Sequence, residues 1–190
     1  MVTRSTPYAA RLDIDYPEKL DRFTTFFRIL WVIPAAILVG FLGDGLFFAT
    51  MLMIVFRVKY PRWWFDFARE LTRFGARVGA YFALLTDAYP STTDEQMVHL
   101  EIDYPDVERE LNRWLPLVKW LLAIPHYIVL FFLFIGAIVV WIAAWFAILF
   151  TGAFPRGMFD YMVGVARWSL RVEAYAFLLV TDQYPPFSLK

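Results

Sequence analysis

The sequence predicts a mainly α-helical integral membrane protein built from two parallel copies of one unit. Of its 190 residues, 60% are hydrophobic and 20% are aromatic, and the mean hydropathy is +0.52, well above what a soluble domain carries. These residues are concentrated in two blocks. Asp44 is the only acidic or basic side chain in residues 29–56, and His126 is the only one in residues 120–155. Long apolar blocks with a single ionisable residue each predict membrane helices.

The duplication is visible as motifs that recur in the same order. Ile-Asp-Tyr-Pro occurs at residues 14–17 and 102–105, and Pro-Arg-x-x-Phe-Asp occurs at 61–66 and 155–160. Each copy then contains two arginines four residues apart and closes with Thr-Asp-x-Tyr-Pro. We therefore divide the chain into an N-terminal tail (1–11), a first copy (12–90), a linker (91–99) and a second copy (100–187).

A short strand and a surface helix are expected at the start of each copy. Apolar and acidic residues alternate over residues 12–16 and again over 100–104, and a period of two is typical of a half-buried strand. Proline then ends the strand and can occupy the first turn of a helix. The acidic residues that follow complement the positive helix start.

A transmembrane hairpin is predicted next in each copy, which gives four membrane helices in total. The second block can hold two crossings of roughly 17 to 20 residues, so we expect a hairpin over about 115–154 that turns near Gly136. The first, over about 26–56, is interrupted at residues 40–45, and arms of roughly 11 to 14 residues leave a re-entrant hairpin as an alternative. Pro34 and Pro125 are expected to kink the two hairpins for packing.

The basic residues predict the orientation. All 18 Lys and Arg lie outside the two apolar blocks, so under the positive-inside rule both hairpins enter from the cytoplasm and return to it. Both termini are then cytoplasmic. Two crossings per copy also give both copies the same orientation, about an axis along the membrane normal.

An amphipathic helix is expected after each hairpin, over about 63–85 and 157–180. At about 100° per residue Asp66 and the arginines of the first segment share one stripe, and Asp160 and the arginines at 167 and 171 repeat it. The stripe is either the solvated face of a helix packed on its hairpin, a site for anionic headgroups or a protein partner, or a polar seam between the copies. In such a seam Asp66 or Asp160, together with Glu173 outside the stripe, would pair with the arginines. The candidate headgroup-binding residues are Arg69, Arg73, Arg77, Arg167 and Arg171.

The closing motifs are expected to run extended, because the residue before proline avoids the helical region, and to pair with the opening strands in a small cytoplasmic sheet. Their aspartates, Asp87 and Asp182, are candidates for structural polar roles, since aspartate in such contexts commonly binds the backbone. His126 has no ligand partner nearby in sequence. We interpret it as a satisfied interfacial histidine rather than a proton or metal site.

Catalytic motifs are not recognisable in this sequence. It lacks a nucleophile elbow, a phosphate-binding loop and a His-Glu-x-x-His zinc motif, and it contains no cysteine for thiolate chemistry. We therefore predict no catalytic residues, no metal site and no cofactor. The net charge of zero argues against a nucleic-acid partner, which requires a basic surplus.

Four stretches of the second copy carry a family resemblance: residues 113–126, which contain Arg-Trp-Leu-Pro-Leu-Val-Lys and end in Pro-His, and residues 154–157, 167–175 and 181–189. They resemble the prokaryotic membrane family known as domain of unknown function 4389. The first copy keeps the pattern in degraded form, without the histidine and the Trp-Leu-Pro-Leu run. The resemblance implies a prokaryotic cytoplasmic (inner) membrane and assigns no activity.

We predict from these observations a non-enzymatic polytopic membrane protein that acts as an accessory, scaffold or lipid-interacting subunit. Its expected partners are membrane lipids, anionic lipids among them, and a second copy or a larger membrane complex. One alternative is a small transporter or channel with a path between the copies or between protomers. Another is an enzyme acting on lipid headgroups at the cytoplasmic face. The scarcity of polar groups inside the apolar blocks favours the first interpretation.

Overall fold

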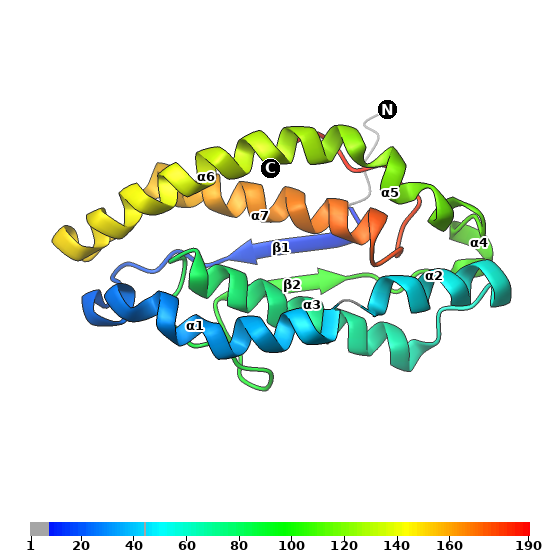
Figure 1. Cartoon of the computed structure of the whole chain (residues 1–190), viewed down its shortest axis with the longest axis horizontal. Helices are drawn as coiled ribbons and strands as arrows, with labels where there is room; N and C mark the ends of the chain where they lie inside the picture. The colour runs from blue at the N-terminus through cyan, green and yellow to red at the C-terminus, as the bar shows by residue number, and fades with distance from the viewer. Residues whose placement is uncertain (1–7, 44) are drawn as a thin grey trace, which may run out of the picture.

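Two strands lie at the centre of the structure, with long helices on both sides of them (Figure 1). This computed structural model describes residues 8–43 and 45–190. The first copy contains β1 (Ala10–Ile14), α1 (Arg22–Gly43), α2 (Leu46–Arg57) and α3 (Arg62–Phe82). The second contains β2 (Val98–Ile102), α4 (Val107–Glu110), a 3-10 turn at Leu115–Leu117, α5 (Lys119–Leu122), α6 (Ile124–Thr151) and α7 (Arg156–Ala176).

The two strands form an antiparallel sheet in which Leu12 faces Leu100. Because these are equivalent positions of the two copies, the register places a pseudo-twofold axis between them, perpendicular to the sheet. The small sheet expected from the alternating pattern is therefore confirmed, but its predicted pairing is wrong. The opening strands pair with each other, and the closing segments 86–90 and 181–185 contain no strand, because their carbonyl groups bind buried basic side chains of their own copy.

A single unbroken helix replaces the predicted hairpin of the second copy. Helix α6 runs for 28 residues, and Gly136, the expected turn, lies in its middle. The hydroxyl of Tyr161, on α7, donates a hydrogen bond to the Leu133 carbonyl at 2.8 Å, and a Cβ at position 136 would lie 2.6 Å from that hydroxyl. The glycine thus allows close approach of two helices, which is why the predicted turn there is wrong.

In the first copy the apolar block forms α1 and then α2, which continue along the same edge of the molecule (Figure 1). Over the described residues, two segments are long and apolar enough to cross a membrane, Arg22–Arg57 and Ile124–Thr151. The prediction of four membrane helices is therefore corrected to two candidates. Asp44, in the expected first turn, lies outside the described residues.

Helices α3 and α7 lie where amphipathic helices were expected and connect the two copies. Helix α3 packs on α1 of its own copy and on β2 of the other copy, whereas α7 packs on α6 and on β1. The inner face of the sheet is buried by this exchange: Ala10, Leu12, Ile14, Val98, Leu100 and Ile102 are all at most 6% exposed. Each copy therefore depends on the other to cover its strand.

The surface helices expected after the strands are largely missing. Residues 15–21 contain no helix, and α4 in the second copy has four residues. Both segments instead carry a tyrosine into the other copy. The Tyr16 hydroxyl donates to the Phe154 carbonyl at 2.5 Å, and the Tyr104 hydroxyl donates to the Tyr60 carbonyl at 2.6 Å. These reciprocal contacts are a second consequence of the pseudo-twofold arrangement.

Candidate functional site

Two of the predicted headgroup-binding arginines reach across the boundary between the copies. Arg73, on α3, donates to the Leu100 carbonyl at 3.3 Å, and Arg167, on α7, donates to the Leu12 carbonyl at 2.9 Å. Arg167 also pairs with the carboxylate of Asp13 at 3.1 Å. These equivalent contacts form a polar seam between each amphipathic helix and the strand of the other copy, which is one of the arrangements considered for the charged stripe.

The other arginines of the stripe also bind groups within the chain. Arg77 is 8% exposed and donates to the Ser91 carbonyl at 2.5 Å, and Arg171 is 5% exposed and donates to the carbonyl of Lys190. Arg69 lies 3.3 Å from the Asp66 carboxylate. Asp160 is exposed. Binding of lipid headgroups by these arginines stays a prediction.

Each copy contains a buried basic side chain paired with the aspartate of its closing motif. Arg28, on α1, is 1% exposed and pairs with Asp87. Lys119, on α5, is 0% exposed, and its ammonium lies 2.7 Å from the carboxylate of Asp182. Both aspartates keep partial exposure, 30% and 22% of their side chains. Burial lowers the pKa of Lys119, and hydrogen bonding to Asp182 opposes that shift.

The surroundings of the two ion pairs match closely. The basic side chain donates to the carbonyl of the preceding threonine, at 2.5 Å from Arg28 to Thr86 and at 2.7 Å from Lys119 to Thr181. A carboxylate oxygen of each aspartate accepts a backbone N–H at 2.6 Å, from Asp21 in the first copy and from Asn112 in the second. Each pair therefore ties the start of the apolar segment to the end of the same copy.

The partners of these aspartates were missed in the sequence. The sequence singles out Asp87 and Asp182 through their repeated motif, whereas Arg28 and Lys119, which directly precede the two apolar blocks, were assigned no role. Aligning the two copies on Pro34 and Pro125 places both basic residues at the same position, six residues before the proline. That alignment was the available signal.

His126 is buried within the second copy, at 0% exposure. Its Nδ1 accepts a hydrogen bond from the Trp168 indole at 3.1 Å, and Phe187 stacks on the ring at 4.0 Å between centroids. In the described part of the chain its Nε2 has no hydrogen-bond partner. Pro125 lies in the first turn of α6, whereas Pro34 lies inside α1, so the two equivalent prolines occupy different helical contexts.

A cavity of about 1670 Å³ lies between the two copies, larger than the roughly 300 to 1,000 Å³ typical of a small-molecule site. The inner face of β1 contributes Leu12 and Ile14, and the remaining walls come from α1, α2, α3, α5, α6, α7 and the adjoining turns. Most of the side chains that line it are aliphatic or aromatic. An apolar space of this size fits hydrocarbon chains.

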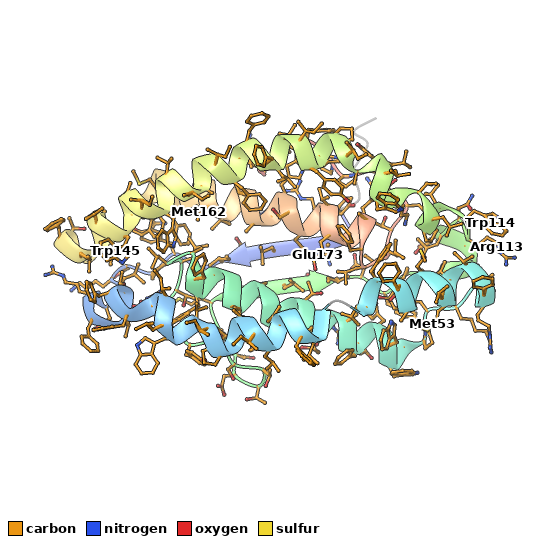
Figure 2. The ribbon with its side chains drawn as sticks, in the orientation of Figure 1. Met53, Arg113, Trp114, Trp145, Met162 and Glu173 are labelled. Atoms are coloured by element: carbon orange, nitrogen blue, oxygen red, sulfur yellow. The ribbon has the colours of Figure 1, made fainter. Side chains whose placement is uncertain are left out.

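Glu173 and Tyr127 are the titratable residues among the described residues that line the cavity. Figure 2 shows Glu173 on the side of α7 that faces the middle of the molecule. Glu173 is exposed to the cavity, and desolvation of its carboxyl by the surrounding protein raises the pKa to about 7. The Tyr127 hydroxyl is buried and has no hydrogen-bond partner within the described residues. Sequence reasoning had noted Glu173 only as a counter-charge outside the arginine stripe.

The family model described as Domain of unknown function (DUF4389) matches residues 22–93 and 114–188. The two matched regions fall in the two copies and together cover more than half of the chain. Neither the curated proteins nor the solved structures contain a match to this chain.

Proposed function

Since the chain belongs to the DUF4389 family through both of its copies, and the description of that family assigns no activity, we propose its function from geometry. The protein is a non-enzymatic, lipid-interacting membrane protein that lies flat in one leaflet of the bilayer. The observation that carries this proposal is the division of the molecule by its sheet into a charged side and an apolar side.

The outer face of the sheet is charged. Residues alternate along both strands, so the side chains opposite Leu12 and Leu100 point away from the cavity. Arg11 pairs with Glu101 at 3.2 Å and with Asp103 at 2.8 Å, and most of the other side chains on this face are exposed. The polar residues of this face are Arg11, Asp13, Asp15, His99, Glu101 and Asp103.

The other side is apolar. The cavity lies on it, and α1, α2 and α6 expose large aliphatic and aromatic side chains, among them Phe41, Phe48, Phe131 and Phe132. A continuous apolar surface of this extent is unfavourable in water and marks contact with a membrane or a partner. The hydropathy of the two apolar segments, 2.1 and 2.8, favours the membrane.

A crossing along the long axis of the molecule would be costly. The strands and the long helices all run along this axis (Figure 1), so such a crossing would place Arg11 and Glu101 near the bilayer centre. A charged side chain there costs about 2.5 to 3.5 kcal/mol even on the lowest scales. The backbone groups at the outer edges of both strands, apart from the Leu12 and Leu100 carbonyls that arginines bind, would also have no hydrogen-bond partner in hydrocarbon. The flat orientation avoids both costs.

The flat orientation also places the pseudo-twofold axis along the membrane normal. Both copies then face the same side of the membrane, as the distribution of basic residues led us to expect. The identity of that side as the cytoplasm stays a prediction, as does association with a second copy or a larger complex.

Single-cysteine labelling tests the proposal, because the natural chain contains no cysteine. Arg109, whose side chain is 86% exposed, and Gly157, where a side chain has open space, lie near opposite ends of α6. We expect Arg109→Cys and Gly157→Cys to react with an impermeant maleimide from the same side of sealed vesicles. Val139→Cys, at a position 63% exposed in the middle of α6, should react from neither side. Labelling of the two end positions from opposite sides would contradict the flat orientation.

A further inference from the structure

The carboxyl of Glu173 has no structural partner. It forms no hydrogen bond or ion pair with the described residues, and its raised pKa is caused by burial alone. The wall of the same cavity includes Phe47 and Met51 from α2, Gly79 from α3, Ala83 just after α3, and Leu12 and Ile14 from the sheet. Tyr127 on α6 is the one other titratable group that lines the cavity within the described residues.

The fold does not require this carboxyl. Glu173 is equivalent to Gly79 in the first copy, where a Cβ would meet nothing within 4 Å. Tyr127 is equivalent to Ala36, because each lies two residues after the proline that both copies share. By contrast, the buried ion pairs and the arginine contacts to the strands occur in both copies. Polar groups found only in the second copy are therefore separate from the interactions that build the repeat.

The two polar groups lie at one end of the cavity. The ring of Tyr127 stacks on Phe177 at 6.3 Å between centroids, and Phe177 lies one helical turn after Glu173. Phe47 closes the same region with an edge contact to Phe177 at 5.7 Å. An apolar cavity with a few convergent polar groups at one end is the usual form of a site for an amphiphile.

We infer that this cavity binds the tail of a single amphiphilic lipid, while Glu173 binds a hydrogen-bond-donating head, a hydroxyl or an amine. The inference deepens the proposed function and rests on it, since the ligand comes from the membrane. A carboxylate oxygen accepts hydrogen bonds from such a head, whereas Tyr127, whose hydroxyl is buried, contributes its ring to the cavity wall. No Lys, Arg or His lines the cavity among the described residues, so an anionic head finds no counter-charge there.

Native mass spectrometry of the full chain, released from detergent, tests the inference with three probes whose hydrocarbon chains have the same length and unsaturation: monooleoylglycerol, oleylamine and oleate. We expect one bound copy of the glyceride or the amine, and occupancy by oleate lower by about tenfold, the ratio that loss of one charge-assisted hydrogen bond produces. Equal occupancy by all three probes would overturn the inference.

Variants locate the bound head. Glu173→Gly, which copies the first repeat, should reduce binding of the glyceride and the amine by about tenfold, whereas Glu173→Gln should reduce binding of the amine more than that of the glyceride. Tyr127→Phe should leave binding of all three probes unchanged, because the Tyr127 hydroxyl is buried. Asp160→Asn, a change at an exposed carboxylate on the same helix, should change nothing and serves as the matched control.

Two readouts keep this test separate from that of the proposed function. Between pH 5 and 8 the occupancy by oleylamine should rise in the natural chain, because the carboxyl ionises, and should stay flat in Glu173→Gln. Co-flotation with phosphatidylcholine vesicles should be the same for every variant. If Glu173→Gly still floats and binds all probes like the natural chain, the head site is wrong and the membrane proposal stands. If no variant floats, the proposed function fails with it.

Discussion

The first and second copies share their architecture and differ at the cavity. Each has a buried basic residue paired with an aspartate, and each sends an arginine to the strand of the other copy. They differ at Glu173 and Tyr127, which line the cavity and are equivalent to Gly79 and Ala36 of the first copy. They also differ at His126, which is equivalent to Ala35. The shared residues thus account for the fold, and the unshared ones include the carboxyl of the head site proposed above.

The copies also break their apolar segments at different points. The second copy has the turn at Leu115–Leu117 and the short helix α5 before an unbroken α6. The first has an unbroken start in α1 and a break before α2. The last turns of the two apolar segments still coincide: Ile54 and Ile148 are equivalent and both 0% exposed. The C-terminal end of each segment therefore packs alike in the two copies, while the position of the break differs.

Breaking one buried ion pair should have the largest effect. Asp182→Ala leaves the ammonium of Lys119 buried without its counter-charge, and loss of one partner of a buried pair costs about 3 to 5 kcal/mol. We expect the lower end of this range, because the Asp182 side chain keeps 22% of its surface exposed. Denaturant unfolding in detergent measures the change. The double variant Lys119→Met with Asp182→Asn should lose less, and a loss for Asp182→Ala no larger than for Asp160→Ala would show that the pair is not structural.

Filling the helix contact of α6 should have the next largest effect. Gly136→Ala places a methyl group against the Tyr161 hydroxyl, and overpacking of this kind costs about 1 to 3 kcal/mol. Gly40→Ala, in α1 with open space around it, is the matched control and should be neutral or slightly stabilising. Thermal unfolding compares the two. Adding Tyr161→Phe should recover part of the loss, and no recovery would locate the strain elsewhere.

Glu173, which has no titratable equivalent in the first copy, should make the stability of the protein depend on pH. Its ordinary pKa of 4.5 is raised by burial to about 7 in the folded chain. Below pH 4.5 the carboxyl is protonated in both the folded and the unfolded chain. Between pH 4.5 and about 7 it loses its proton in the unfolded chain first, so the free energy of unfolding falls as pH rises. Thermal scans from pH 4 to 8 should show this fall in the natural chain relative to Glu173→Gln. Parallel curves for the two proteins would contradict the desolvation of the carboxyl by the surrounding protein.

Substitutions at the ends of α6 and α2 should have the smallest effect on stability. Gly152 ends α6 with φ of 75°, and the equivalent Val58 ends α2 with φ of 49°, a conformation that costs a residue with a side chain about 1 to 2 kcal/mol. Gly152→Ala should lower the free energy of unfolding by about 1 kcal/mol. Val58→Gly should change it less, because relief of strain is offset by lost packing of the valine. An unchanged free energy of unfolding for Gly152→Ala would show that alanine adopts the left-handed conformation at this position without strain.

Local patterns in the sequence predicted the parts of this fold that depend on neighbouring residues. The alternation at residues 12–16 and 100–104 indicated the strands, and the charged stripes indicated α3 and α7. Their partners depended on distant contacts. The strand of each copy pairs with the other strand because the two copies interlock, and no short stretch of sequence contains that information.

The hairpin prediction failed for a related reason. Block length was interpreted as two crossings, with a glycine as the turn, but Gly136 accommodates Tyr161 from another helix. The ion pairs were half visible: the aspartates stood out in repeated motifs, whereas Arg28 lies 59 residues before Asp87. The cavity could not be predicted, because its lining comes from β1, from six helices and from the turns that adjoin them, which are distant from one another in the sequence.

Orientation of the helices in aligned bilayers tests the central claim most directly. Because α1, α3, α6 and α7 all run along the long axis of the molecule (Figure 1), oriented circular dichroism reports one common direction for most of the helical residues. We predict helix axes close to the plane of the membrane, with the charged face of the sheet toward water. Helix axes close to the membrane normal would contradict the account.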